Sequence, residues 1–373
     1  MYLEKMSLLD YRNYATCDVE FSKGVNVFLG ENAQGKTNLM EAIYVLAMTR
    51  SHRTSNDKEL IAWHKEFAKI SGRVQKKNTQ FPLEILLSSK GKKAKLNHLE
   101  QRKLSEYVGH LNVILFAPED LAIVKGSPSV RRRFIDMEIG QISPIYLHHL
   151  ANYQHVLKQR NHYLKQLMIG KRDDHTFLEV LTEQLSTHGA HLLKERMSFV
   201  KQLEKWAAPI HHEITQAKEV LKISYQPSVE ATNWEDVDQI FLDLMTQFEK
   251  GKKRELDQGN TLYGPHRDDL LFFVNEQNVQ TYGSQGQQRT TALSIKLAEI
   301  ELIHDEVGEY PILLLDDVLS ELDDERQTHL LTAIQDKVQT FLTTTSLDGI
   351  KKHVLRQPRT FIVTNGCVEL EDK

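Results

Sequence analysis

Uninterrupted hydrophobic runs near the two ends of the chain predict strands of a buried sheet. Residues 25–29 form a short and mostly apolar run, and residues 312–315 are apolar throughout. Short runs without alternation of apolar and polar residues are typical of parallel strands that are covered on both faces. Apolar residues with helical spacing follow the first run, at Leu39, Met40, Ile43 and Leu46. The pattern therefore predicts an α/β fold in which a strand, a loop and a helix follow one another.

The middle of the chain has the periodicity of long helices. The pair Ser143–Pro144 is typical of a helix start, and we expect this helix to reach about Gly170. Over residues 178–206, apolar residues mostly alternate in steps of three and four, which is coiled-coil spacing, and we expect this helix to end before Pro209. A third amphipathic helix is expected over residues 234–248. The helices fit an ordinary helical subdomain or a short antiparallel coiled-coil arm, and we favour the arm.

Strand-like sequence returns after Gly259, so the helices interrupt the α/β part of the chain. We expect an N-terminal lobe at residues 1–126, a helical arm domain at residues 127–257 and a C-terminal lobe at residues 258–373. A chain of 373 residues is too long for one small core and suggests two domains. The α/β domain would then be assembled from segments far apart in the sequence.

The loop after the first apolar run has the sequence of a phosphate-binding loop. Residues 30–37 read GENAQGKT, which fits the pattern GxxxxGK[ST]. In such a loop, backbone N–H groups wrap the phosphates at a helix N-terminus, the lysine reaches the β- and γ-phosphates, and the last hydroxyl binds magnesium. A chance glycine-rich turn is the alternative, and the flanking strand and helix argue against it. We expect the nucleotide to contact this segment, called the phosphate loop below: Gly30, Glu31, Asn32, Ala33, Gln34, Gly35, Lys36 and Thr37.

Two acidic residues, Asp316 and Asp317, follow the second apolar run. A carboxylate at the end of such a strand can hold Mg²⁺ together with Thr37, and a second one can orient or deprotonate the attacking water. We therefore expect Asp316 to be a metal ligand, and Lys36 and Asp317 to be catalytic in nucleotide hydrolysis. A solvated turn is the alternative for the aspartate pair taken alone.

A third motif precedes the aspartate strand. Residues 283–289 read GSQGQQR and open a helix with a long apolar stripe. A helix start with a serine hydroxyl and free N–H groups is an anion site. The stretch resembles the signature motif of ABC-type ATPases, and an ordinary capped helix is the alternative. In that superfamily Ser284 and Gly286, with Gln285 and Gln287 beside them, would meet the γ-phosphate of ATP bound by a second copy of the chain.

The order of these motifs gives the expected fold class. Residues 320–323, Ser-Glu-Leu-Asp, look like the D-loop of the same superfamily. Together the motifs imply an α/β, ABC-type P-loop ATPase head with a mixed sheet, plus the inserted helical arm.

The composition of the chain indicates where in the cell it is expected. The chain has two cysteines, Cys17 and Cys367, which make no disulfide framework and no metal cluster. No apolar run is long enough to span a bilayer, and the N-terminus has no signal pattern. We expect a cytoplasmic protein without a membrane partner.

The formal net charge is −4, so the chain as a whole does not attract DNA. Any DNA-binding surface must therefore be a local cluster of basic residues. Several basic clusters are candidate DNA-binding segments, and each has the alternative of a solvated surface; one of them, Lys252, Lys253 and Arg254, lies where the arm returns. The first lies in an expected turn and contains Lys92, Lys93 and Lys95. The second begins the arm with Arg131, Arg132 and Arg133, which have a further alternative, pairing with carboxylates such as Asp136 and Glu138.

An ATPase head split by a helical arm resembles the SMC-type branch of the superfamily, and within it the chain is most similar to the RecF family of bacterial recombination and repair proteins. The similarity runs from the first strand to about residue 346. Besides the motifs above, it is carried by these stretches: 11–14, 50–53, 116–121, 124–128, 131–134 and 264–269.

The resemblance implies a function. Proteins of this family bind ATP and DNA, pair through their heads when ATP is bound, and hydrolyse ATP slowly. They act with RecO and RecR to place RecA on gapped DNA, and they support the SOS response. We therefore expect ATP and Mg²⁺ as cofactors, an ATP-dependent homodimer, a slow DNA-stimulated ATPase activity, and single-stranded, duplex or gapped DNA as partner. An ATPase subunit of another machine, such as a chromosome-organising complex, is the alternative.

Some residues are assigned only by this resemblance. Arg12 and Asn13 are candidate ATP contacts near the adenine, with a polar hairpin turn as the alternative. His52, Arg53, His266 and Arg267 are expected to line the nucleotide or DNA side of the head. Asp317 replaces the catalytic glutamate of transporters, and residues 343–346 stand where transporters have a switch histidine.

Overall fold

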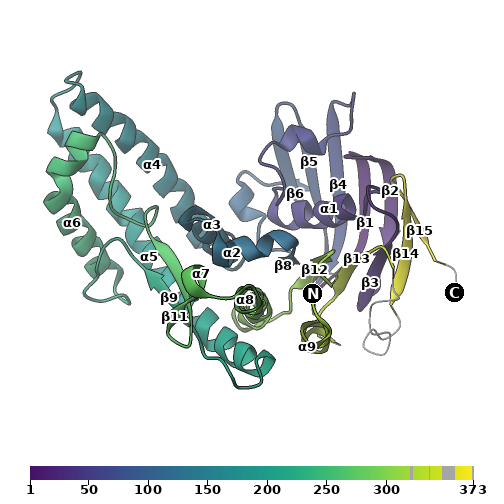
Figure 1. The fold of residues 1–373 in the computed structure, drawn as a ribbon. Coiled ribbons are helices and arrows are strands. Elements are labelled where there is room, and N and C mark those ends of the chain that lie inside the picture. Colours follow the sequence, from purple (N-terminus) through teal and green to yellow (C-terminus); the bar gives the residue numbers. More distant parts are fainter. Residues whose placement is uncertain (320–321, 336, 347–357, 372–373) are drawn as a thin grey trace. The chain divides into compact units, whose positions relative to one another are not determined.

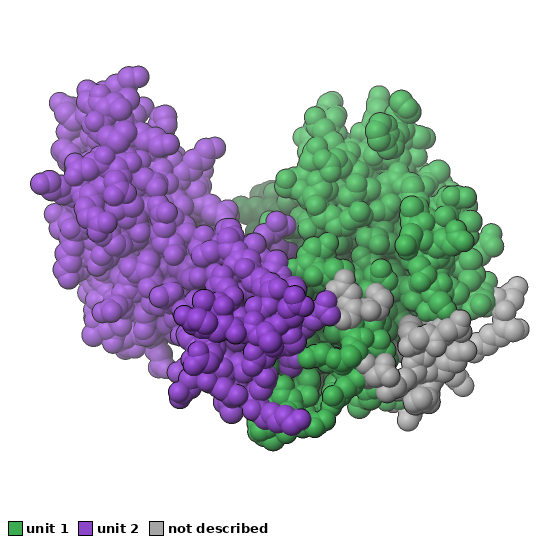
Figure 2. All heavy atoms as spheres, viewed as in Figure 1, with its two compact units in different colours: residues 1–120, 210–217, 292–373 green, residues 121–209, 218–291 purple. Residues whose placement is uncertain are grey.

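The computed structural model describes residues 1–319, 322–335, 337–346 and 358–371. The chain forms two compact units, shown in different colours in Figure 2. Unit 1 comprises Met1–Asp120, Ile210–Ala217 and Ala292–Lys373, and unit 2 comprises Leu121–Pro209 and Lys218–Thr291. Among the described residues, no helix combines the length and the apolar character needed to cross a membrane.

The central sheet of unit 1 has the strand order β15-β14-β3-β13-β12-β8 (Figure 1). Its neighbours are parallel except for the hairpin β14–β15. Strands β12 and β13 are buried almost throughout, and for β12 the continuous apolar run predicted this. The strands are β3 (Val25–Leu29), β8 (Val113–Phe116), β12 (Ile312–Asp316), β13 (Thr340–Thr344), β14 (Arg359–Thr364) and β15 (Cys367–Leu370).

The second sheet of unit 1 is antiparallel, with the order β2-β1-β4-β5-β6-β7. Burial alternates along β4 and β5, so these strands have one covered face and one exposed face. Its strands are β1 (Tyr2–Tyr11), β2 (Tyr14–Glu20), β4 (Phe67–Gln75), β5 (Gln80–Ser88), β6 (Gly91–Leu96) and β7 (Leu99–Glu100).

Helix α1 (Lys36–Met48) contacts strands of both sheets and is buried along almost its whole length. A helix that is apolar on all sides suits this position, because neither face is left to solvent. Unit 1 also contains α9 (Asp324–Ile334), most of α8 (Gln285–Val307) and the short 3₁₀ helices η1 (Asp57–Leu60), η2 (Leu104–Glu106) and η3 (Pro118–Asp120).

Unit 2 joins long helices to a small antiparallel sheet with the order β11-β10-β9. Its helices are α2 (Leu121–Lys125), α3 (Pro128–Ile142), α4 (Pro144–Met168), α6 (Val237–Gln258), α7 (Val279–Tyr282) and most of α5 (His175–Ile214). Its strands are β9 (Leu221–Gln226), β10 (Asp269–Val274) and β11 (Gln277–Asn278).

Three long helices, α4, α5 and α6, form most of the helical part of unit 2. A buried arginine on α4 joins them, because Arg160 donates to Thr182 on α5 at 2.9 Å and to Glu255 on α6 at 2.6 Å. It also donates to Thr261 at 2.8 Å. Buried charges stabilise a particular arrangement only when all their hydrogen bonds are made, and here the guanidinium has a partner in each direction.

Helices α5 and α6 differ at their ends from the ranges that the sequence predicted, and α6 continues to Gln258, beyond the expected residue 248. Helix α4 begins as expected, since the Ser143 hydroxyl accepts from the Tyr146 N–H at 3.1 Å. The prediction that α5 ends before Pro209 was wrong. The helix continues to Ile214, and Ala207 and His211 on either side of the proline are fully buried. Packing on both sides of the proline compensates for the hydrogen bond that is lost because proline has no N–H donor. Trp234 lies outside α6, which begins after an Asp236 cap.

The units also divide the chain differently from the expected boundaries at 126 and 257. Residues 121–126 and 258–291 fall in unit 2. The larger difference is that of residues 258–291, which contain β10. Strand β10 belongs to unit 2 because it pairs with β9, with Asp269 opposite Gln226 and Val274 opposite Leu221. Strand β9 follows α5 and was not predicted.

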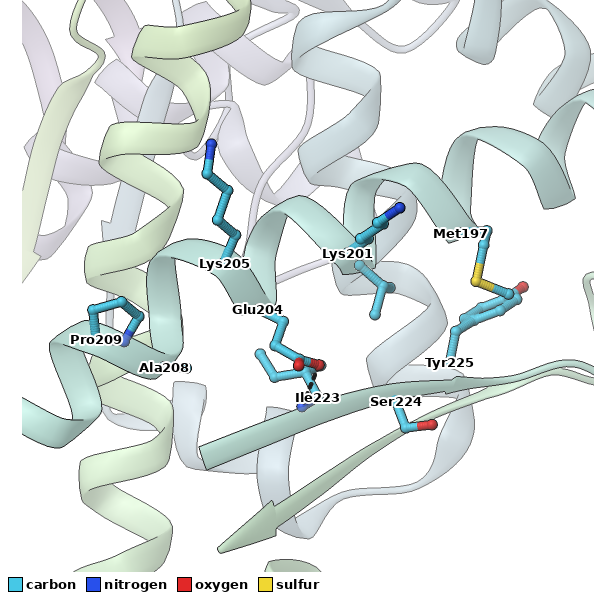
Figure 3. Close-up of a pocket in the computed structure, with 10 residues that line it drawn as sticks. Met197, Lys201, Glu204, Lys205, Ala208, Pro209, Ile223, Ser224 and Tyr225 are labelled. Carbon is cyan, nitrogen blue, oxygen red and sulfur yellow. Dashed lines mark hydrogen bonds between the residues drawn. The ribbon is translucent and has the colours of Figure 1, made fainter. Parts of the chain in front are cut away.

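An open pocket of about 580 Å³ lies between α5 and β9 (Figure 3). Because β9 is the edge strand of its sheet, some of its backbone groups lack a strand partner. The Glu204 carboxylate on α5 accepts from the Ile223 N–H at 3.0 Å, as the dashed line in Figure 3 shows. Glu204 thus satisfies one amide of the edge strand.

Candidate functional site

The phosphate loop connects β3 to α1, as the sequence predicted. Its last residue before the helix, Gly35, has a φ of 119°. A Cβ at this position would lie 2.6 Å from the Asn13 Nδ2 atom and 2.9 Å from the Tyr14 hydroxyl. Glycine is therefore required both by the backbone conformation and by the close approach of the β1–β2 turn.

Lys36 is the first residue of α1 and its side chain folds over the phosphate loop. The ammonium donates to the main-chain carbonyls of Gly30 and Glu31, the latter at 2.8 Å. Burial lowers the pKa of Lys36, while the charges of Asp317 and Asp316 oppose this shift. The Lys36 amino group thus lies over the loop in which the sequence predicted phosphate binding.

Asp316 ends β12 and meets the residue that follows Lys36. Its Oδ1 atom accepts from the Thr37 hydroxyl at 3.2 Å and from the Thr343 hydroxyl at 2.8 Å. Burial raises the pKa of the Asp316 carboxyl, and the two hydroxyl donors oppose the rise. The structure therefore brings together the two residues that the sequence assigned to a metal ion.

Asp317 has a left-handed backbone, with a φ of 56°. Its N–H donates to the Thr343 hydroxyl at 2.9 Å. Residues other than glycine rarely adopt this conformation, and a fixed bend after a strand re-aims the side chain. Thr343 therefore bonds both members of the aspartate pair. The sequence placed Thr343 in the segment that replaces the switch histidine but gave it no contact.

Arg12 and Asn13 lie in the turn between β1 and β2, beside the phosphate loop. Arg12 makes two hydrogen bonds to the buried Glu41 carboxylate, at 2.9 and 2.8 Å, and Ser51 donates to the same carboxylate. Burial alone would raise the pKa of Glu41, but these donors lower it below its ordinary value. Asn13 donates to the Gln34 carbonyl at 3.1 Å. Glu41 was missed because only the fold reveals its partners.

The other residues assigned by resemblance are split between the units. Arg53 donates to Asn38 at 3.0 Å beside α1, and burial lowers the pKa of its neighbour His52. His266 and Arg267 belong to unit 2 instead. His266 bonds the Tyr153 hydroxyl at 2.7 Å, and Arg267 donates to the Thr261 carbonyl at 2.8 Å. Both side chains therefore bond partners within unit 2.

The signature segment forms a reciprocal helix cap at the start of α8. The Ser284 hydroxyl accepts from the Gln287 N–H at 3.2 Å, and the Gln287 side chain accepts from the Ser284 N–H at 2.9 Å. This is a capping box. Ser284, Gln285, Gly286 and Gln287 thus stand at a helix N-terminus, as expected. In the D-loop stretch, Ser320 and Glu321 lie outside the described residues, and Asp323 caps α9.

The first basic cluster lies on strand β6, and the turn that the sequence predicted there is not formed by these three lysines. Each lysine has a carboxylate partner: Lys92 with Asp57 at 2.9 Å, Lys93 with Glu100 at 3.0 Å, and Lys95 with Glu84 at 2.9 Å. Such surface pairs are weak and readily exchange for other anions.

The three arginines at the start of α3 differ in how far they are buried. Arg131 is 1% exposed and makes two bonds to Asp269, at 2.7 and 2.8 Å. Arg132 donates to the Asp268 carbonyl at 2.6 Å. Arg133 is exposed. The ion pair suggested for this cluster does occur, although its acid is Asp269 instead of Asp136 or Glu138.

Comparison with known proteins agrees with this geometry. Residues 2–368 match the family described as RecF/RecN/SMC N terminal domain. The chain is 60% identical over 368 residues to the DNA replication and repair protein RecF of Bacillus pumilus, covering 99% of this chain and 100% of that protein. It is 61% identical over 370 residues to the RecF of Enterococcus faecalis, covering 99% of each.

Comparison with solved structures also finds a RecF protein. The recombination mediator protein RecF-ATP in the RecFOR pathway superposes with a TM-score of 0.92 at 34% identity, covering 100% of this chain and 98% of that one. An Smc head domain with an extended coiled coil from Pyrococcus furiosus has a TM-score of 0.55 at 16% identity, which shows a shared fold alone.

The fold and the site together define an SMC-like ATPase head of mixed α/β structure. The sequence identity to RecF proteins over their full length identifies the family more narrowly than the fold does. The chain belongs to the RecF family of DNA replication and repair proteins.

Proposed function

We propose that this chain is an ATP-dependent DNA-binding protein of recombinational repair and replication-fork maintenance. The observation that carries the proposal is the hydrogen bond between Thr37 and Asp316, because it joins the phosphate loop to the aspartate strand in one site. The relatives named for DNA replication and repair, and the RecF structures named with ATP and ATPrS, support the assignment.

In this proposal, the N–H groups of the phosphate loop and the Lys36 ammonium bind the β- and γ-phosphates of ATP. The loop carbonyls that now accept from Lys36 would be replaced by phosphate oxygens. Arg12 and Asn13 border the site from the β1–β2 turn, with Arg12 oriented by Glu41.

Thr37 and Asp316 are the residues that fit Mg²⁺. They offer a hydroxyl and a carboxylate oxygen side by side, which are the hard ligands this ion takes. Mg²⁺ would supply charge neutralisation between the phosphates. Asp317 would orient the attacking water, and its short side chain, compared with a glutamate, is consistent with slow hydrolysis.

We further propose that ATP joins two heads. The start of α8 carries the capping box, and the N-terminus of a helix favours anions. Ser284, Gln285, Gly286 and Gln287 of one copy would meet the γ-phosphate held by a second copy. ATP-dependent pairing would then regulate DNA binding.

The proposed partners are DNA, whether single-stranded, duplex or gapped, and proteins of the RecO and RecR type. The name of the RecFOR pathway in the solved relatives supports the second group. The output would be placement of RecA on gapped DNA in the bacterial cytoplasm, with support of the SOS response. The pairing partners of Lys92, Lys93 and Lys95 are surface carboxylates that DNA phosphates can replace.

Sedimentation velocity with ATP and Mg²⁺ tests the proposal. We expect the wild-type chain to dimerise with ATP and to remain monomeric without nucleotide, and we expect Ser284→Arg to remain monomeric in both states. Titration of gapped, duplex and single-stranded DNA at several salt concentrations, with and without ATP, tests the DNA part. Equal dimerisation by wild type and Ser284→Arg would count against the shared site.

A further inference from the structure

Two turns from opposite ends of the chain lie against the phosphate loop. The first is the β1–β2 turn with Asn13, and the second is the β14–β15 turn formed by Asn365 and Gly366. Neither turn is part of the GxxxxGK[ST] pattern. The first turn and the adjoining Tyr14 contact the loop at Gln34 and Gly35, and the second turn contacts it at Gln34.

The Gln34 peptide is held from outside the loop. Its carbonyl accepts from the Gly366 N–H at 3.0 Å and from the Asn13 side chain at 3.1 Å. The Gln34 side-chain oxygen accepts from the Asn365 N–H at 2.7 Å. Three donors therefore fix the orientation of this residue.

The next peptide is held in the same way. The Gly35 carbonyl accepts from the Tyr14 hydroxyl at 2.9 Å, in addition to the helical bond from the Leu39 N–H at 3.0 Å. Tyr14 is fully buried, so its hydroxyl has a defined position.

The orientation of these carbonyls determines the orientation of two donors. In a trans peptide, the C=O and the N–H of the next residue point in opposite directions. Holding the Gln34 and Gly35 carbonyls toward the turns therefore directs the N–H groups of Gly35 and Lys36 to the other side. In a phosphate loop, these are donors to the phosphates.

We propose that Tyr14 and the Asn365–Gly366 turn are positioning residues that prepare the phosphate loop for its ligand. They act through the peptide planes of the loop and do not touch the nucleotide. This inference rests on the proposed binding of ATP. It adds the C-terminal hairpin to the parts of the chain on which that binding depends.

The local sequence explains why the second turn can do this. Asn365 and Gly366 have φ angles of 49° and 75°, which is the left-handed pair that a two-residue hairpin turn requires. A Cβ on Gly366 would lie 2.3 Å from the Asn13 carbonyl oxygen. The turn can approach the loop this closely only with glycine at this position.

The test compares Tyr14→Phe with Tyr107→Phe. Tyr107 is also buried, and its hydroxyl donates to the Leu46 carbonyl at 2.8 Å, near the opposite end of α1. Each variant therefore loses one hydroxyl bonded to a carbonyl at one end of the same helix or its loop. We expect similar falls in melting temperature, but an ATP affinity about three- to tenfold lower only for Tyr14→Phe, measured by calorimetric titration with ATP and Mg²⁺.

A second variant tests the hairpin itself. Gly366→Ala is expected to push the turn away from Asn13 and to lower the affinity for ATP without abolishing folding. If Tyr14→Phe and Gly366→Ala both bind ATP with the affinity of the wild type, the positioning role is wrong, whereas the proposed binding of ATP still stands. Absence of ATP binding by the wild-type chain would overturn the proposed function together with the positioning role.

Discussion

Thr37 and Asp316 are 279 residues apart in the chain and share a hydrogen bond of 3.2 Å. Thr37 follows β3 through the phosphate loop, and Asp316 ends β12. Strand β13 lies between β3 and β12, and its Thr343 donates to the same Asp316 oxygen. The carboxyl ends of parallel strands meet at one edge of a sheet, so the site exists only after this sheet has formed.

Thr343 should matter for hydrolysis. Thr343→Val removes the hydroxyl that donates to Asp316 and accepts from the Asp317 N–H, so neither aspartate keeps its orientation. We expect kcat for ATP to fall about tenfold, because misplacing a catalytic group by a fraction of an ångström has effects of this size. We expect the affinity for ATP to change much less.

Thr340→Val is the matched control for this variant. Thr340 lies on the same strand, is buried, and its hydroxyl donates only weakly to the Val338 carbonyl, at 3.4 Å. Steady-state ATPase assays of the two variants separate the two positions. Equal kcat values would show that Thr343 has no role beyond packing.

Lys36→Arg should separate binding from turnover. The guanidinium keeps the positive charge over the phosphate loop but presents its donors in a planar fork, so it cannot occupy the position of the ammonium. We expect hydrolysis to fall more than nucleotide affinity. Lys337→Arg is a suitable control, because Lys337 is a partly exposed partner of Glu301 in the same unit. Unchanged turnover in Lys36→Arg would contradict the assignment.

Local patterns in the sequence were sufficient for the central part of the site. The apolar runs predicted β3 and β12, and the loop motif predicted its place between β3 and α1. These elements are determined by short-range periodicity and by glycine, which act over a few residues. These elements also predicted that Thr37 and Asp316 lie close together, and they share a hydrogen bond.

Residues whose partners are distant in the chain could not be predicted. For the arginine cluster, pairing with acids of the same helix was one of the alternatives, but Arg131 pairs with Asp269, 138 residues away. Glu41 looked like an ordinary helical glutamate until the fold placed Arg12 against it. Strand β9 is short and becomes recognisable only through its pairing with β10.

The Glu41 carboxylate should make stability depend on pH. Its pKa is lowered in the folded chain by Arg12 and Ser51, so it stabilises the fold at pH values above the ordinary glutamate pKa. That stabilisation is lost as the pH falls through the lowered pKa. We expect Glu41→Gln to lose about 2 kcal/mol at pH 7, and the difference from wild type to shrink as the pH falls below about 4.5.

Thermal unfolding between pH 7 and pH 4 measures this effect. Glu84→Gln is the comparison, since Glu84 pairs at the surface with Lys69 and Lys95. Surface pairs contribute less than about 1 kcal/mol, so Glu84→Gln should change little at any pH. A loss of stability in Glu41→Gln that is the same at pH 7 and pH 4 would contradict the ionised pair.

Arg131 and Arg133 should have different roles despite being two residues apart. Arg131→Ala leaves the Asp269 carboxylate without its buried partner and should destabilise the fold by about 3 kcal/mol. Arg133→Ala removes an exposed charge and should leave the melting temperature unchanged. If Arg133 contacts a DNA phosphate, its loss lowers the affinity for all DNA sequences and reduces the salt slope by about 1.

Fluorescence anisotropy with gapped DNA at several salt concentrations measures that slope. Lys93→Ala provides the same measurement for the β6 cluster, because Lys93 is the most exposed of its three lysines. A salt slope equal to that of wild type in both variants would remove both clusters from the DNA interface.

Ser284 has two possible reasons for its position, and one substitution separates them. As a helix cap, its hydroxyl accepts from the Gln287 N–H, and an aspartate would do this equally well. As a ligand of the γ-phosphate in a second copy, it must be neutral, because a carboxylate would repel the phosphate. We therefore expect Ser284→Asp to keep or raise the melting temperature while reducing ATP-dependent dimerisation at least tenfold, or roughly 1.4 kcal/mol.

Ser284→Thr is the control for this substitution, since it keeps both the cap and the hydroxyl without adding charge. Sedimentation with ATP and Mg²⁺ should show a dimer for Ser284→Thr and mainly monomer for Ser284→Asp. Dimerisation by Ser284→Asp at the wild-type level would leave the serine with its capping role only. The γ-phosphate of one head would then have to be recognised by other residues of its partner.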